Sequence, residues 1–246
     1  MFYFIQFPNL VGSTQDTDQF DLYQYLDGNW GLVFMHPGDF TPVCTTELAA
    51  SSRLGPEFEK RGVKVCGFSC NDAASHRAWI KDIKAATGAD VSFPLFCDPN
   101  RDHATAIGVL DESNRDAAGL PLTVRSVFVI KPDKTIALMM TYPASSGRNF
   151  TEVLRAIDTC QLTSKHAVAT PADWTPGDRV IVNFPLTDAQ ATEKFGEGAY
   201  TIVDVPSEKG KALTKHYLRF LPDPETKSKK TGLLGKIMSA KTQSAQ

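Results

Sequence analysis

WGLVFMHPGDFTPVCTTE, residues 30–47, combines a buried strand, a loop and the start of a helix. Its first part, Trp30–Met35, is a continuous apolar run with a β-branched residue near its centre, which is typical of a strand buried on both faces. His36-Pro37-Gly38 ends this run and predicts a loop. A helix is expected from Thr45 to about Arg61, because Gly62 provides a stop signal. The stretch therefore predicts a strand–loop–helix unit of an α/β sheet.

Further strands and helices alternate along the first two thirds of the chain. The expected elements are a strand at Val63–Cys70, a helix at Ala74–Thr87, a strand at Phe93–Phe96, a helix at Ala104–Leu110, a hairpin of Ser126–Ile130 with Thr135–Met140, and a helix at Asn149–Leu162. Strand–helix–strand connections produce parallel neighbours, whereas a hairpin produces antiparallel ones. The predicted fold class is therefore α/β with a mixed central sheet.

The sequence changes in character after Leu162. Prolines from Pro171 to Pro224 separate short β-like segments, namely Arg179–Asn183, Tyr200–Val205 and His216–Phe220. This pattern predicts a small C-terminal β-rich domain. The expected domains are residues 1–164 and residues 165–222, followed by a tail at residues 223–246.

The tail has a local charge of +3 and a small apolar island that ends at Met238. A short basic amphipathic helix there could contact an anionic membrane surface or a partner. A flexible tail is favoured, because the island is small and Gly232 and Gly235 interrupt it.

The composition excludes several classes of protein. The 246 residues are 42% hydrophobic and 22% charged, which excludes a disordered or collagen-like chain. A net charge of −2 gives no general reason to bind nucleic acid. The apolar runs are too short to span a bilayer, and Met1–Phe7 lacks the basic region and cleavage site of a signal peptide. Five cysteines, an odd number, indicate free thiols in a reducing compartment, so we expect a cytoplasmic protein.

Cys44 is the cysteine whose surroundings predict reactivity. Thr41 is a favourable N-cap residue and Pro42 a favourable first helical residue, which places Cys44 third in the helix. Its sulfur would face unpaired backbone N–H groups and the positive end of the helix dipole, and both favour a thiolate over a thiol. The Thr41 hydroxyl could donate a hydrogen bond to the same sulfur. The alternative is a small apolar residue that only fills space at the helix start.

The spacing Pro37-x-x-x-Thr41-x-x-Cys44 resembles the active-site motif of peroxiredoxins, and the six residues from Pro42 (PVCTTE) are similar to the one-cysteine, peroxiredoxin-6-like subfamily. The similarity extends over nearly the whole chain. Its other blocks are Asp27–His36 (DGNWGLVFMH), Pro121–Arg125 (PLTVR), Tyr142–Phe150 (YPASSGRNF) and Val168–Trp174 (VATPADW). The resemblance implies a thioredoxin-like fold with a small C-terminal domain.

The resemblance also implies a thiol-specific peroxidase that reduces hydrogen peroxide and organic or lipid hydroperoxides in antioxidant defence. Cys44 would be the peroxidatic nucleophile, which attacks a peroxide oxygen and becomes a sulfenic acid. Arg125 would support the thiolate and orient the peroxide, Thr41 would bridge sulfur and peroxide, and Pro37 would shield the pocket from water. Glu47 could serve either the helix N-terminus or catalysis. Three further residues match positions near the pocket: His36, Val43 and Arg148.

The remaining cysteines are expected to be bystanders. Cys66 and Cys70 lie on one face of a predicted strand, where core packing is favoured. Cys66, Cys70, Cys97 and His103 could together form a zinc site, but the spacing of Cys66 and Cys70 along a strand gives no tight pair of ligands. No metal or cofactor is expected. Cys160 could form intermolecular disulfides. Because no cysteine has the Val-Cys-Pro setting of a resolving cysteine, an external thiol should reduce the sulfenic acid: glutathione, or a protein of the thioredoxin or glutaredoxin type.

The sequence departs from the family at a second site. Some peroxiredoxin-6 proteins also have phospholipase A2 activity, attributed to a serine, a histidine and an aspartate. Here Asn29 replaces the serine and Tyr23 the histidine, while Asp133 keeps the acidic position. An amide cannot act as the acyl acceptor that a serine hydroxyl provides. We therefore expect no phospholipase activity of this type.

Two questions of assembly and role follow from the resemblance. It implies a homodimer or a higher oligomer, with the C-terminal domain packed against the partner. A second hypothesis is not enzymatic: oxidation of Cys44 would switch a redox-sensitive chaperone or a peroxide-signalling protein. Catalytic consumption of peroxide in excess dithiothreitol would support the enzyme, whereas stoichiometric consumption would support the sensor.

Overall fold

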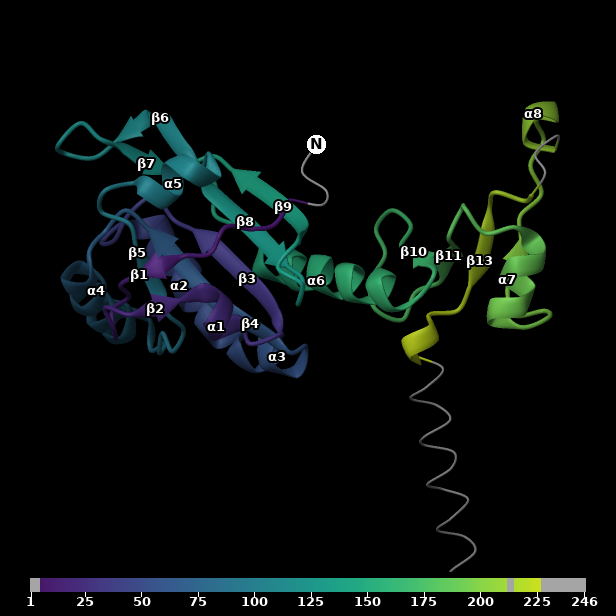
Figure 1. The fold of residues 1–246 in the computed structure, drawn as a ribbon, viewed down its shortest axis with the longest axis horizontal. Coiled ribbons are helices and arrows are strands. Elements are labelled where there is room, and N and C mark those ends of the chain that lie inside the picture. The colour runs from purple at the N-terminus through teal and green to yellow at the C-terminus, as the bar shows by residue number, and fades with distance from the viewer. Residues whose placement is uncertain (1–4, 212–214, 227–246) are drawn as a thin grey trace, which may run out of the picture. The chain divides into compact units, whose positions relative to one another are not determined.

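The computed structural model describes residues 5–211 and 215–226. The chain divides into two compact units, Met1–Leu154 and Arg155–Gln246, whose described residues Figure 1 shows in purple to teal and in green to yellow. The boundary lies inside helix α6, Phe150–Lys165, and not after residue 164 as the composition suggests. The change in composition after Leu162 coincides with the end of α6. The boundary between the two units lies within this helix, where the composition does not change.

A five-stranded mixed sheet forms the centre of the first unit (Figure 1). Its strands, in spatial order, are β5 (Leu95–Cys97), β4 (Val63–Ser69), β3 (Trp30–Met35), β8 (Arg125–Ile130) and β9 (Ile136–Tyr142). β3, β4 and β5 run parallel, while β8 is antiparallel to both β3 and β9. The predicted mixed sheet is confirmed.

Helices and the N-terminal segment cover both faces of this sheet. They are α1 (Leu22–Leu26), α2 (Pro42–Arg53), α3 (Gly55–Lys60), α4 (Ala73–Thr87), α5 (Asp102–Ile107) and the first part of α6. Val33 and Met35 of β3 belong to a core shared with residues 7–26 and α5. Phe34 points to the other face, where its ring meets Phe150 of α6 edge-on. Because both faces are covered, β3, β4 and β8 are almost entirely buried, as their continuous apolar runs predict.

The helix expected at Thr45–Arg61 is in fact two helices. α2 ends at Arg53, and α3 begins at Gly55 with Pro56 in its first turn. Proline has no N–H to donate to the preceding turn, and its ring disfavours helical geometry at the residue before it. The prediction of a single helix is therefore wrong. The stop signal is placed correctly, since Gly62 follows α3 with a φ of +63°.

Two pairs of short strands in the first unit have no counterpart in the sequence predictions. β1 (Val11–Gly12) pairs with β2 (Phe20–Asp21), and β6 (Leu110–Arg115) pairs with β7 (Pro121–Thr123). β6 is polar and largely exposed, so it lacks the alternation that indicates a strand. The helix expected at Ala104–Leu110 ends at Ile107, and Leu110 is the first residue of β6.

The second unit contains a four-stranded antiparallel sheet. Its order is β10 (Val168–Ala169), β11 (Val180–Val182), β13 (Arg219–Leu221) and β12 (Thr201–Ile202). Trp174 is buried in the core beside it. The unit also contains α7 (Asp188–Phe195) and α8 (Glu208–Lys211), which were not predicted. α7 begins with a capping box of Thr187 and Gln190, a start signal that the sequence does carry.

Residues 223–226 belong to this second unit and not to a flexible tail. Asp223 is buried and accepts a hydrogen bond from the backbone N–H of Gly177, and the Glu225 carboxylate lies 3.2 Å from the His166 ring. The rest of the expected tail, residues 227–246, lies outside the described residues. Among the residues that are described, no helix has the length and apolar character needed to cross a membrane.

Candidate active site

The first turn of α2 places Cys44 just beyond the end of β3. Thr41 is the N-cap residue, with an extended backbone, and Pro42 occupies the first helical position. Cys44 is therefore third in the helix, which confirms the predicted placement. Its side chain is fully buried. The backbone N–H groups of the helix start and the helix dipole thus act on a thiol that is shielded from bulk water.

Arg125 lies beside Cys44 because β8 is antiparallel to β3. Phe34 pairs with Val127, so the first residue of β8 lies next to the end of β3 and faces the same side as Val127. Arg125 Nη1 lies 3.3 Å from Cys44 Sγ. Nε and Nη2 donate to the carbonyl of Ala144, at 2.9 and 2.7 Å. These bonds hold the guanidinium against the sulfur, where its positive charge stabilises a thiolate.

Glu47 joins Arg125 to Arg148. It lies one turn after Cys44 on the same face of α2, and it is 3% exposed. Its carboxylate accepts hydrogen bonds from Arg125 Nη1 at 2.7 Å and from Arg148 Nε and Nη2 at 2.9 and 2.8 Å. The backbone N–H of Arg148 adds a fourth bond of 2.7 Å. Glu47 therefore positions both arginines. Its spacing of three residues from Cys44 indicates the shared face of α2 but not the two arginine partners.

The buried cluster contains two arginines and one glutamate, so one positive charge is left uncompensated by these three side chains. Burying a charge without a partner is costly. The Cys44 sulfur lies beside this uncompensated charge, 3.3 Å from Arg125 Nη1.

The Thr41 hydroxyl does not donate to the sulfur, contrary to expectation. Its hydroxyl donates to the carbonyl of Gly38 at 2.8 Å, because the loop brings this carbonyl within reach of the N-cap residue. The expected hydrogen bond from Thr41 to Cys44 is not formed in this structure, and the role of Thr41 in binding peroxide stays a prediction. Pro37 is buried in the same loop, and Val43 is half-buried in the first turn of α2.

His36 is fully buried at the end of β3, and its ring packs against Trp79 with 5.1 Å between the ring centroids. Neither ring nitrogen has a hydrogen-bond partner within the described part of the chain. Burial lowers the pKa of His36 well below its usual value, and the nearby His76, Arg148 and Arg125 lower it further. His36 is therefore neutral at physiological pH and adds no charge to the arginine cluster.

Comparisons with known proteins agree with this geometry. The AhpC/TSA family matches residues 5–139, and the C-terminal domain of 1-Cys peroxiredoxin matches residues 160–198. Peroxiredoxin-6 of Gallus gallus is 45% identical over 207 residues, which cover 82% of this chain and 89% of the relative. The chain belongs to the one-cysteine peroxiredoxins.

Solved peroxiredoxin structures show the same fold. A cysteine-to-serine mutant of the Peroxiredoxin 6 of Arenicola marina has a TM-score of 0.83 and 40% identity, and the match covers 91% of this chain and 99% of that one. A yeast mitochondrial 1-Cys peroxiredoxin has a TM-score of 0.79 and 41% identity, with coverage of 90% and 99%. The thioredoxin-like α/β fold and the activity of a thiol-dependent peroxidase are thereby confirmed.

This peroxiredoxin contains a second buried polar cluster, which was not predicted. Asp39 Oδ2 lies 2.8 Å from His76 Nδ1, and both side chains are fully buried. The Ser75 hydroxyl donates to the same carboxylate oxygen at 2.6 Å, and the Asp39 backbone N–H donates to the Asn71 side chain at 3.1 Å. Asp39 lies in the loop before α2, whereas its partners lie in or just before α4. The pair is 37 residues apart in sequence, so no local pattern signals it.

The protonation of His76 is expected to make the stability of this peroxiredoxin depend on pH. Burial alone would lower the pKa of His76, but the hydrogen bond and charge of Asp39, together with the Cys97 thiol, raise it from 6.5 to about 9. His36, whose ring centroid is 6.2 Å away, stays neutral. The folded chain therefore keeps a proton that the unfolded chain releases near pH 6.5. The resulting stabilisation is complete below pH 6.5 and is lost as the pH rises through about 9.

Replacement of His76 by glutamine tests this pH dependence. In denaturant unfolding between about pH 6 and about pH 10, the free energy of unfolding of the wild type should fall by about 3 kcal/mol more than that of His76→Gln. Equal falls in the two proteins would contradict the assignment of the proton to His76.

The other cysteines of this peroxiredoxin are buried. Burial raises the pKa of Cys66 to about 12 and that of Cys70 to about 11, so both remain protonated and poorly nucleophilic. His103, the fourth residue of the zinc arrangement considered above, packs edge-on against Phe96. Within residues 5–211 and 215–226, no three histidine, cysteine or acidic side chains are grouped as a metal site requires.

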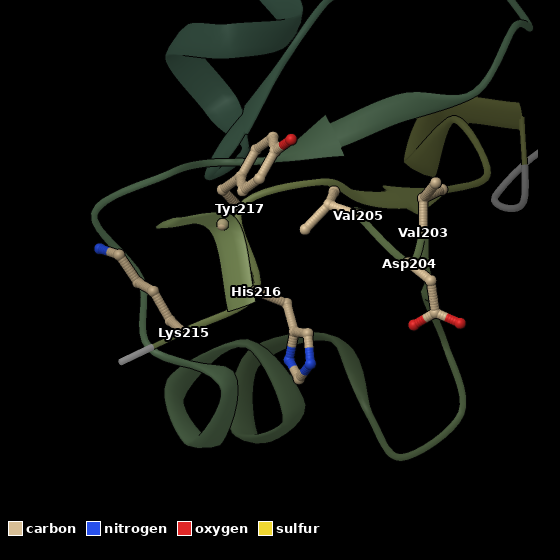
Figure 2. Close-up of a pocket in the computed structure, with 7 residues that line it drawn as sticks. Val203, Asp204, Val205, Lys215, His216 and Tyr217 are labelled. Atoms are coloured by element: carbon tan, nitrogen blue, oxygen red, sulfur yellow. The ribbon is translucent and has the colours of Figure 1, made fainter. Parts of the chain in front are cut away.

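Two hollows on the described surface differ in their relation to Cys44. The first, of about 300 Å³, lies beside the start of α2 and is lined by residues of that turn and of α4, among them Phe40, Thr41 and Trp79. The second, of about 470 Å³, lies in the second unit around His216 and Tyr217 (Figure 2). It contains no residue of the peroxiredoxin site, whereas the first hollow is lined by Thr41 and Pro42, which begin the helix that carries Cys44.

Proposed function

We propose that Cys44 reduces hydroperoxides by direct nucleophilic attack. The observation that carries this proposal is the 3.3 Å contact between Arg125 and a buried thiol in the first turn of a helix. The thiolate sulfur gives an electron pair to one peroxide oxygen, so that an S–O bond forms while the O–O bond breaks. The leaving oxygen takes up a proton and departs as water or an alcohol. The sulfur is oxidised to a sulfenic acid, and the peroxide is reduced.

Arg125 assists at both ends of this step. Four hydrogen bonds fix its guanidinium, through Nε, Nη1 and Nη2. Within the described residues, one N–H of Nη2 has no partner and can donate to a peroxide oxygen. Negative charge develops on the leaving oxygen as the O–O bond breaks, and this donor stabilises it. Glu47 and Arg148 keep the guanidinium in place during the reaction.

The loop before α2 completes the proposed pocket. The Thr41 hydroxyl turns from the Gly38 carbonyl to the bound peroxide, and its rotation needs no movement of the backbone. Buried Pro37 excludes water from the sulfur. Neutral His36 and half-buried Val43 contribute uncharged walls.

An external thiol completes the proposed cycle. The first thiol attacks the sulfenic sulfur and forms a mixed disulfide with loss of water, and a second thiol attacks this disulfide and releases Cys44. The protonated, buried thiols of Cys66 and Cys70 are poor candidates for a resolving role. The yeast relative is described as having a thiol resolving mechanism via glutathione/thioredoxin systems. For this chain we propose glutathione or a protein of the thioredoxin or glutaredoxin type.

Steady-state consumption of hydrogen peroxide tests the proposed function. The wild type is assayed with dithiothreitol, glutathione, thioredoxin and glutaredoxin, each in excess over the protein. Many turnovers with at least one reductant are expected. Consumption of one peroxide per chain with every reductant would instead support the alternative, in which oxidation of Cys44 switches a chaperone or a signalling protein.

The proposed setting is a cytoplasmic homodimer or a higher oligomer. Five buried cysteines suit a reducing compartment. Assembly through the second unit is proposed from the family resemblance of the sequence. Light scattering after size exclusion gives the mass of the assembly for comparison with 26.9 kDa for one chain. With a net charge of −2, no nucleic-acid partner is proposed.

No phospholipid hydrolysis that depends on Asn29 is expected. The Asn29 amide donates to the carbonyls of Leu26 and Asp27 at the end of α1, at 3.0 and 3.2 Å. The hydroxyl of Tyr23 donates to the carbonyl of Phe7. Neither residue supplies a hydroxyl nucleophile with an adjacent base. Hydrolysis of phospholipid vesicles by the wild type that disappears in Asn29→Ala would contradict this expectation.

A further inference from the structure

Cys44 must react in turn with two molecules of different size, although its side chain is fully buried. A peroxide is small enough to enter a narrow pocket. The thiol reductant is larger, and it must approach the sulfenic sulfur on the side opposite the S–O bond. The first turn of α2 therefore has to shift before the second reaction. Whatever holds this turn in place favours the reaction with peroxide and opposes the reaction with the thiol.

Two groups of contacts hold this turn. On one side, Arg125 binds Cys44 and Glu47. On the other side, Asp39 fastens the preceding loop to α4 through His76 and Ser75, at 2.8 and 2.6 Å. The carboxylate and the imidazole are both fully buried, and hydrogen bonds that involve an ionised partner are stronger than neutral ones, especially away from water. Asp39 is thus one of the points at which α4 holds the start of α2, beside the bond of 3.1 Å from Trp79 Nε1 to the Thr45 hydroxyl.

Phe40, between Asp39 and the N-cap residue, shows that this attachment is under strain. Its φ is +56°, a conformation that is unfavourable for an aromatic residue and persists only where the surroundings impose it. The Phe40 side chain is 55% exposed, so burial in the core does not impose it. The conformation is therefore imposed by the attachment of Asp39, by the bond from Thr41 to the Gly38 carbonyl and by the start of α2. Release of Asp39 would let Phe40 return to a negative φ and displace the turn that carries Cys44.

We propose that Asp39 and His76 are positioning residues, which hold the first turn of α2 in its peroxide-reactive place and so limit the access of the thiol reductant to oxidised Cys44. The inference rests on the proposed function of Cys44 as the reacting thiol. It adds that one buried pair, outside the arginine cluster, sets the balance between the two halves of the cycle.

The test measures the two half-reactions separately in Asp39→Asn, in His76→Gln and in the double variant. The rate constant for hydrogen peroxide with reduced Cys44 should fall about tenfold, and that for dithiothreitol with the Cys44 sulfenic acid should rise about tenfold. The double variant should match the single ones, because each already breaks the same pair. Asp90→Asn is the control. It removes the exposed ion pair between Asp90 and Lys84 of α4, and it should change neither rate constant.

Opposite changes in the two rate constants, in variants that circular dichroism shows to be folded, support the proposal. A fall in both constants, or no change in either, would overturn the proposal. Labelling of Cys44 by iodoacetamide, followed by peptide mass spectrometry, should also increase in the variants. If Asp39→Asn does not fold, Ser75→Ala removes only one bond to the carboxylate and should give the same opposite changes at smaller size. If the wild type forms no sulfenic acid at Cys44, the proposed function itself fails.

Discussion

Replacement of Cys44 by serine should abolish the catalytic consumption of hydrogen peroxide, with a loss of at least ~10⁴-fold. A serine hydroxyl is nearly the same size as the thiol, but it remains protonated beside Arg125 and cannot be oxidised to a sulfenic acid. The measurement is steady-state peroxide consumption with excess dithiothreitol. Circular dichroism verifies that the variant is folded. Sustained turnover by Cys44→Ser would show that the reacting group lies elsewhere.

Cys160→Ser is the matched control for this experiment. Cys160 lies in α6 and is 9% exposed, and we assign it no role in resolving the sulfenic acid. The variant should therefore retain wild-type turnover with dithiothreitol. A collapse of turnover would mean that a second cysteine takes part, and the one-cysteine assignment of the cycle would be wrong.

Replacement of Arg125 by methionine should lower the second-order rate constant for peroxide by about 10²–10³-fold. The variant loses the donor 3.3 Å from Cys44 Sγ and the donor proposed for the leaving oxygen. Arg125→Lys keeps the charge but not the planar fork that binds the sulfur, Glu47 and Ala144 together, so it should fall between the wild type and methionine. Stopped-flow measurement of the peroxide reaction gives these rate constants directly.

Arg115→Met provides the comparison for Arg125. Arg115 lies in exposed β6 and pairs with Glu112 at 2.6 Å, so its removal should leave the rate constant unchanged. Arg148 still binds the carboxylate of Glu47 when Arg125 is absent, and the fold should therefore persist. A wild-type rate constant in Arg125→Met would limit Arg125 to a structural role.

Local signals predicted the elements whose cause lies within a few residues. The apolar runs of β3 and β4 and the α4 stop at Gly88, with a φ of +71°, are of this kind. Pro56 is also a local signal, and it marks the break between α2 and α3. β6 could not be predicted in the same way, because its polar residues form a strand only through pairing with β7.

The residues of the active site also differ in whether a local signal or a tertiary contact places them. The place of Cys44 follows from the cap and the proline next to it, and Arg125 was identified through the family resemblance. The role of Glu47 depends on Arg148, which lies 101 residues away in sequence. The pair of Asp39 and His76 likewise joins two elements that only the folded sheet brings together. Tertiary pairs of this kind leave no periodic pattern, so spacing alone could not predict them.

The excess of arginine over glutamate around the sulfur also determines how the pocket responds to repeated oxidation. A thiolate balances the cluster, and a neutral sulfenic acid leaves one positive charge that attracts an incoming thiolate reductant. A second peroxide instead produces a sulfinate, which is an anion and restores the balance. The arginine charges that balance the thiolate therefore also balance the sulfinate, which a thiol reductant does not convert back to the thiolate. The working lifetime of each molecule then depends on whether a reductant or another peroxide arrives first.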